Sequence, residues 1–234
     1  MITRDRRLAT GRWLWAFALG VLLWIHGCGG TTSEVVTTPE IEQYRVVRIA
    51  VAPFAVAPRS PGQDRGYATP APAPGGAEKI TDLFFLKLNT REGLSVVPPS
   101  YVAPLMGGGS GLAPGRLSLK ELGEKLDVGA ILMGTVEIYK ERQGTALGLE
   151  RAQDAAAVGF TARLVSTKDG VTLWTGEYYE RQHPLVEDLS GFLERGAQYL
   201  TVDKLADSAV DHVLKGFPLG RPYQRSSRWE GTAP

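Results

Sequence analysis

Few residues in this 234-residue sequence have the type and spacing that chemistry requires. The chain contains one cysteine, Cys28, and three histidines. One cysteine rules out a disulfide framework and a cysteine-cluster zinc site. His183 precedes a proline at a predicted strand exit, and His212 lies on the edge of a helical apolar stripe, where we expect it half-buried. Because a zinc site needs three or four ligands at matched spacing, we predict no metal site.

Other catalytic signatures are equally incomplete. The glycine-rich loop Gly107–Gly111 lacks the Lys-Ser/Thr that follows a phosphate-binding loop. No Gly-x-Ser-x-Gly elbow is present. Adjacent acids such as Glu187 and Asp188, or Glu121 and Glu124, fall at helix-surface positions that solvation explains. We therefore predict no catalytic residue, no cofactor and no enzyme activity, although two acids far apart in sequence could still serve a glycosidase.

Cys28 follows an uncharged apolar run of 13 residues, 13–25, and a basic start. This run is too short to span a bilayer but suits a signal-peptide core. With the small residue Gly27 directly before it, Cys28 resembles the cleavage and acylation site of a bacterial lipoprotein. The resemblance implies removal of residues 1–27, lipid (palmitate) attachment at Cys28, and a stable membrane anchor. Gly29, where Asp would favour inner-membrane retention, implies the periplasmic face of the outer membrane.

Charge is divided unevenly along the chain. The leader carries a net +3 and the remainder a net −2. A slightly acidic body offers no electrostatic basis for binding nucleic acid. The apolar fraction of 43% is that of an ordinary globular domain.

Four regions are expected. They are a signal peptide over 1–27, a lipidated flexible tether over 28–44, a periplasmic domain over 45–218 and a disordered tail over 219–234. Within the domain, apolar patterning predicts strands at 45–54, 94–97, 130–139, 158–164 and 172–181. Helices are expected at 78–88, at 185–195, after a Ser118–Glu121 capping box, and after Thr201. This order predicts an α/β (α+β) fold with one mixed sheet: strand-helix-strand-helix, then a three-strand antiparallel meander joined by Asp169-Gly170, and a C-terminal helix.

Aromatic residues gather on the meander. Trp174 and Tyr178 are expected in the core, and Tyr139 and Tyr179 on the surface. An exposed aromatic face could bind a sugar or a protein, but core filling is favoured.

Three segments together resemble the curli-secretion lipoprotein (CsgG-like) and penicillin-binding-protein activator (LpoB-like) group. They are Arg48–Phe54, with its closing Pro-Phe; Leu126–Gly134, similar to the group's helix-to-strand segment; and Asp169–Trp174, similar to its hairpin. The resemblance implies a non-catalytic α/β domain with an assembly, secretion or cell-wall role. It does not extend to a pore, because the charged residues 140–155 offer no lipid-facing side.

We therefore expect an outer-membrane lipoprotein whose domain binds another envelope component, with an envelope protein as partner. One alternative is an activator of a peptidoglycan synthase, which the 16-residue tether 29–44 mildly disfavours because its reach is short. The other is a periplasmic glycan or muropeptide hydrolase.

Overall fold

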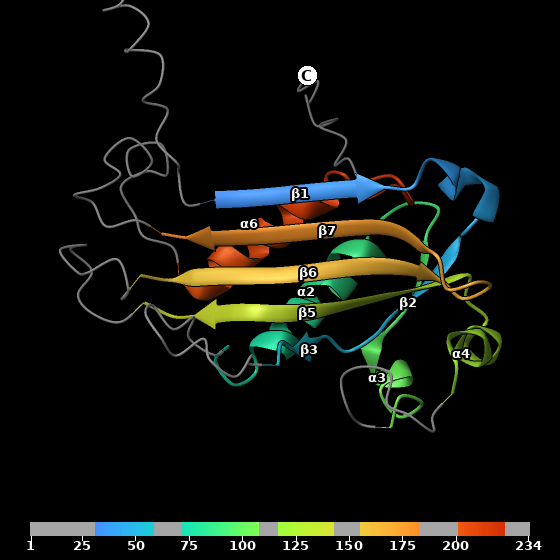
Figure 1. The fold of residues 1–234 in the computed structure, drawn as a ribbon, viewed down its shortest axis with the longest axis horizontal. Coiled ribbons are helices and arrows are strands. Elements are labelled where there is room, and N and C mark those ends of the chain that lie inside the picture. Colours follow the sequence, from blue (N-terminus) through green and yellow to red (C-terminus); the bar gives the residue numbers. More distant parts are fainter. Residues whose placement is uncertain (1–30, 59–71, 108–116, 143–154, 183–200, 223–234) are drawn as a thin grey trace, which may run out of the picture.

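The computed structural model describes residues 31–58, 72–107, 117–142, 155–182 and 201–222 (Figure 1). The predicted signal peptide with Gly27 and Cys28, the helix expected over 185–195, the acids Glu187 and Asp188, and His183 lie outside these residues. None of the helices in the described part of the chain combines the length and the apolarity that a membrane crossing needs.

A single mixed sheet organises the domain, as the sequence predicted, and it has seven strands where five were expected. Its order is β1-β7-β6-β5-β2-β4, with β3 pairing on β5 beyond the end of β2. Strand β2 is parallel to β4 and β5, whereas β5, β6, β7 and β1 are successively antiparallel. The strand bounds are Thr31–Thr37 (β1), Arg48–Val51 (β2), Ala55–Val56 (β3), Ser95–Val97 (β4), Ala130–Lys140 (β5), Ala157–Ser166 (β6) and Thr172–Arg181 (β7).

Two helices cover one face of the sheet. They are α2, Gly76–Asn89, and α6, Val202–Leu214 (Figure 1). Their apolar stripes pack on the inward side chains of the meander, where Phe84 lies edge-on to Phe160 with ring centroids 5.6 Å apart. Thr201 caps α6 as predicted, and Trp174 donates from Nε1 to the Gly216 carbonyl at 3.1 Å just past its end.

The other face is covered only in part. The short helices α3, Pro99–Val102, and α4, Leu119–Leu126, pack over β2, β4 and the start of β5 through a second apolar cluster that includes Val102, Leu122 and Ile131. Ser118 and Glu121 form the predicted capping box at the start of α4. No described element covers the same face over β6, β7 and β1, and we call this part of the sheet the open face.

The structure corrects several expectations. Residues 31–44 are not a flexible tether. Thr31–Thr37 forms the edge strand β1, and Pro39–Tyr44 forms the 3-10 helix η2. The ordered domain likewise extends past residue 218, because Leu219 packs on the core and Arg221 pairs with Glu92.

Two side chains also differ from their predicted exposure. Tyr139 is buried rather than on the surface, because a bulge between Val136 and Ile138 turns it toward the helices. His212 is exposed rather than half-buried, although its ring lies 5.7 Å from that of Tyr178.

Candidate functional site

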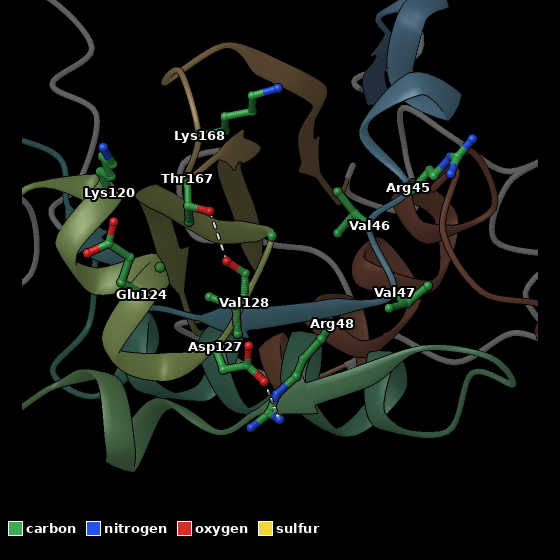
Figure 2. Close-up of a pocket in the computed structure, with 12 residues that line it drawn as sticks. Arg45, Val46, Val47, Arg48, Lys120, Glu124, Asp127, Val128, Thr167 and Lys168 are labelled. Carbon is green, nitrogen blue, oxygen red and sulfur yellow. Dashed lines mark hydrogen bonds and ion pairs between the residues drawn. The ribbon is translucent and has the colours of Figure 1, made fainter.

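A cavity of about 560 Å³ lies at one end of the sheet, between three segments that are distant in sequence (Figure 2). The first is the chain entering β2, the second is α4 with the link to β5, and the third is the β6–β7 turn. The cavity is lined by Arg45, Val46, Val47, Arg48, Lys120, Gly123, Glu124, Asp127, Val128, Gly129, Thr167 and Lys168. We call it the basic pocket.

Backbone hydrogen bonds fix the three segments relative to one another. Gly129 N–H donates to the Arg48 carbonyl at 3.0 Å, and Thr167 N–H donates to the Gly129 carbonyl at 3.1 Å. The Thr167 hydroxyl adds a bond to the Val128 carbonyl at 2.8 Å (Figure 2). Since no link depends on a long side chain, the pocket's floor is set by the fold itself.

Close packing of α4 on the hairpin turn requires a glycine. A Cβ on Gly123 would lie 2.4 Å from the Thr167 Cβ, far inside van der Waals contact. The turn is held from its other side by Tyr44, whose hydroxyl donates to Asp169 Oδ2 at 2.9 Å. This bond raises the pKa of Tyr44, while bonds from Ser166 first and from the Val171 N–H and Tyr44 lower the pKa of Asp169.

Two residues beside the pocket adopt a left-handed backbone that side chains rarely favour. Arg45 has φ 46° and Asp127 has φ 53°, and they are the only such residues other than glycine in the described part of the chain. Arg45 ends η2 and Asp127 ends α4, positions where a left-handed residue commonly closes a helix. Both turns direct the chain into the strands that frame the pocket.

The lining carries four basic and two acidic side chains, a net charge of +2. Arg48 forms an exposed ion pair with Asp127 at 3.4 Å (Figure 2). Within the described ranges, Arg45, Lys120 and Lys168 form no ion pair. Cations beside the buried side chains of Val46 and Val128 suit an anionic group attached to an apolar body.

The pocket offers no reactive pair of groups. Its only hydroxyl, on Thr167, is buried and already donates to a carbonyl. In the parts of the chain that are described, no group of three or more His, Cys, Asp or Glu side chains could hold a metal. The arrangement can therefore bind and orient an anion.

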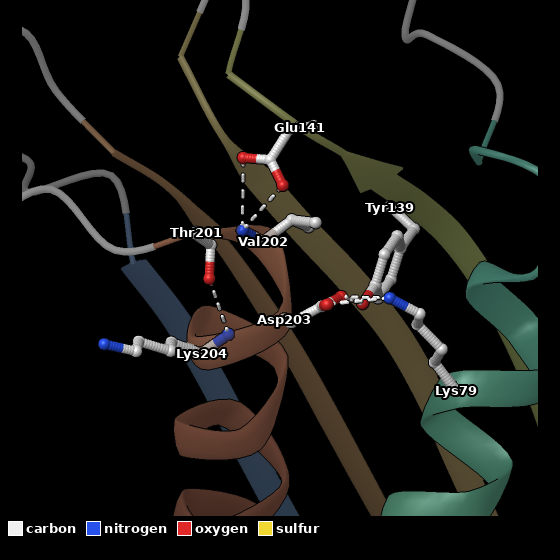
Figure 3. A network of polar contacts seen from close by, with 7 residues as sticks. All are labelled: Lys79, Tyr139, Glu141, Thr201, Val202, Asp203 and Lys204. Carbon is white, nitrogen blue, oxygen red and sulfur yellow. Dashed lines mark hydrogen bonds and ion pairs between the residues drawn. The ribbon is translucent and has the colours of Figure 1, made fainter. Parts of the chain in front are cut away.

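A second polar cluster is structural (Figure 3). Lys79 on α2 donates to both oxygens of Asp203 at 2.6 and 2.7 Å, and Tyr139 donates to the same carboxylate. Burial first, then the bond to Asp203, raises the pKa of Tyr139, whereas the bonds from Lys79 and Tyr139 lower that of Asp203. These contacts join the start of α6 to α2 and β5.

The residues considered for catalysis or metal binding do not meet at the basic pocket, apart from Glu124 on its lining. Glu121 serves the capping box, and of the Gly107–Gly111 loop only Gly107 is described. Sequence reasoning missed the four basic residues. Isolated cations at Arg45, Arg48, Lys120 and Lys168 form no motif, and only the fold gathers them.

Neither a protein-family model nor a curated protein matches this sequence. Among solved structures, the chain is similar to the PelC dodecamer from Paraburkholderia phytofirmans, at 14% identity and a TM-score of 0.47, covering 80% of this chain and 96% of that one. It is similar to lipoprotein GNA1162 from Neisseria meningitidis, at 20% identity and a TM-score of 0.34, covering 64% and 96%. The LpoB C-terminal domain from Escherichia coli matches at 10% identity and a TM-score of 0.31, covering 62% and 94%. LpoB belongs to the group that the sequence motifs resemble. Because these three TM-scores are low, we assign the fold from the strand order of this chain itself.

Proposed function

We propose that this chain is an outer-membrane lipoprotein, anchored through acylated Cys28, whose periplasmic domain binds another envelope component without catalysing a reaction. The basic pocket carries this proposal. Its floor is fixed by backbone hydrogen bonds, its rim is cationic, and it lacks a reactive pair of groups. An exposed acidic segment of an envelope protein is the partner that this chemistry fits.

The position of the pocket agrees with an anchor at Cys28. Strand β1 begins three residues after this cysteine and runs antiparallel to β7, with Thr31 opposite Glu180 and Thr37 opposite Trp174. The basic pocket lies beside the β6–β7 turn, at the far end of the sheet from Thr31 (Figure 1). An anchored domain would therefore direct the pocket away from the bilayer.

The binding part of the proposal is tested with charge-reversed variants in native envelopes. Lys120→Glu combined with Lys168→Glu changes the pocket's net charge from +2 to −2. Lys125→Glu combined with Lys215→Glu makes the same total change at two exposed lysines outside the pocket. We expect a stoichiometric partner to co-purify with the wild type and the control pair, and to be lost from the pocket pair.

Two results would contradict this function. One is an equal yield of partner with both pairs of variants. The other is turnover of muropeptides or glycans by the purified protein, which would favour the hydrolase. The alternative role, activation of a peptidoglycan synthase, is separated by the identity of the co-purified partner and by synthase rates measured with and without the protein.

A further inference from the structure

The edge strand β1 is exposed along its whole length. All seven of its residues, Thr31–Thr37, are exposed, and it pairs with β7 on one side. In the described part of the chain no strand pairs with its other side. Alternate residues of an edge strand point N–H and C=O groups away from the sheet, where an added strand can bond to them.

The two faces of β1 differ in chemistry. On the helix-covered face, Val35 lies over Gly216, where a Cβ would come within 2.7 Å of the valine Cγ1. On the open face, Glu34 stands directly opposite Glu177 of β7. Like charges placed opposite each other across two strands destabilise the pair. Because alternate residues of a strand face opposite sides, Val36 also lies on the open face, so β1 carries Glu34 and Val36 on the open face and Val35 on the helix-covered face.

A third carboxylate lies on the open face near Glu34 and Glu177. Glu137 lies at the bulge of β5 and accepts a hydrogen bond from the Thr161 hydroxyl at 3.1 Å, and Thr161 stands opposite Glu177. Burial raises the pKa of Glu137, and the charge of Glu177 raises it further. The three acids line a hollow of about 410 Å³ on the open face, and its lining contains no basic side chain among the residues described.

We propose that the free edge of β1 binds an extended segment of a partner protein in which basic and apolar residues alternate. The partner strand continues the sheet beyond β1. Its basic side chains lie on the open face over Glu34 and Glu177, and its apolar side chains lie beside Val35. Neighbouring strands are about 4.8 Å apart, so a lysine or arginine opposite Glu34 is long enough to reach toward Glu177 as well.

A second copy of β1 is a poorer occupant. Glu34 is the central residue of Thr31–Thr37. Full-length antiparallel pairing of two such strands about a twofold axis would place the two Glu34 carboxylates opposite each other. That contact adds a like-charge pair to the one already present with Glu177.

The test uses the full chain in detergent and a labelled peptide, acetyl-Lys-Val-Lys-Val-Lys-Val-Lys-amide. Fluorescence anisotropy should show saturable binding, with about tenfold weaker affinity for Glu34→Lys, because the charge reversal replaces attraction by repulsion. The same variant should gain affinity for the peptide in which glutamate replaces lysine. Glu78→Lys, an equal charge change at an exposed position on α2, should bind as the wild type does.

Hydrogen exchange separates strand addition from unspecific attraction. Bound peptide should slow the exchange of β1 backbone amides, while a peptide held only by charge leaves them unchanged. Unchanged β1 exchange would overturn the proposal, as would the absence of saturable binding or equal affinities of wild type and Glu34→Lys. None of these readouts depends on the basic pocket or on lipidation, so the proposed function can fail or hold independently.

Discussion

Arg91 should be among the most costly side chains to remove, although it lies outside the central core. Its guanidinium donates to four backbone carbonyls, one at the last residue of α6 and three in the segment that follows it. Nε bonds Leu219 at 2.8 Å, Nη1 bonds Leu214 at 3.2 Å, and Nη2 bonds Phe217 at 3.1 Å and Gly220 at 3.0 Å. The charge also lies 5.5 Å from the centre of the Phe217 ring. One side chain thus holds the segment that closes α6.

The expected cost follows from these bonds. A hydrogen bond from a charged donor contributes about 1.5–3 kcal/mol to the free energy of unfolding. The sum of four such bonds is an upper bound on the cost of truncating Arg91. The actual cost is smaller, because water enters the half-buried site and bonds the freed carbonyls. We expect Arg91→Ala to lower the free energy of unfolding by about 2–4 kcal/mol. Arg91→Lys should recover less than half of this loss, because an ammonium group lacks the planar fork that spans four carbonyls.

Urea unfolding followed by tryptophan fluorescence measures the effect close to its source, since Trp174 packs edge-on against Phe217 at 5.0 Å. Hydrogen exchange should speed up over 214–221 in both variants. Arg163→Ala removes an exposed arginine from the open sheet face and should stay within about 0.5 kcal/mol of the wild type. An Arg91→Ala loss as small as that of this control would refute the reasoning.

Three further predictions concern packing, pH and the anchor. Gly134→Ala should lower the free energy of unfolding by about 1–3 kcal/mol, as measured by thermal unfolding, because the added Cβ would lie 2.2 Å from the Phe54 ring. An unchanged melting temperature would show that the ring moves aside freely. The lowered pKa of Asp203 stabilises the fold above about pH 4, and this contribution is lost as the pH falls through the folded-state value. Asp203→Asn should therefore flatten the acid limb of the stability curve, and an unaltered limb would contradict the role of Lys79. Cys28→Ala should move the protein from washed outer membranes to the soluble periplasmic fraction or leave it uncleaved, and continued sedimentation would exclude lipid as the anchor.

The central part of the sheet was predictable because its residues are buried. Strand β7 was predicted at Thr172–Arg181, and the structure places it there. The Asp169-Gly170 turn joins it to β6, with Gly170 at φ 74°. The residues of these segments are enough to predict their structure. Alternation of apolar and polar residues is typical of a half-buried strand, and a turn that needs a positive φ favours glycine.

Strand β1 gave no such signal. Its side chains are all exposed, so its sequence lacks the alternation that burial imposes. What holds it in place is backbone pairing with β7 along seven residues, and a backbone contact leaves no trace in residue type. Edge strands of this kind therefore resemble linkers until the partner strand is known.

Tyr139 was misplaced for a different reason. Simple alternation from Val136 puts Ile138 inward and Tyr139 outward. The bulge at Glu137 inserts one unpaired residue and reverses the phase beyond it, so that Ile138 pairs with Gly159 and Tyr139 joins the core. The basic pocket was invisible for a third reason: its cations come from three segments, and nothing in their local sequence relates them.

Because residues 31–37 form a strand of the sheet, the distance between a lipid at Cys28 and the basic pocket is limited. If Cys28 carries the lipid, only residues 28–30 separate it from a strand fixed in the sheet, and three extended residues span at most about 10 Å. The ten residues of β7 cover about 30 Å. One end of β7 lies beside Thr31, and the other end adjoins the turn next to the basic pocket. The pocket would then lie within about 40 Å of the lipid, much less than a long disordered arm would allow. A partner anchored in the opposite membrane would have to extend its own domain across the periplasm to meet it, which favours a partner that resides at the same membrane.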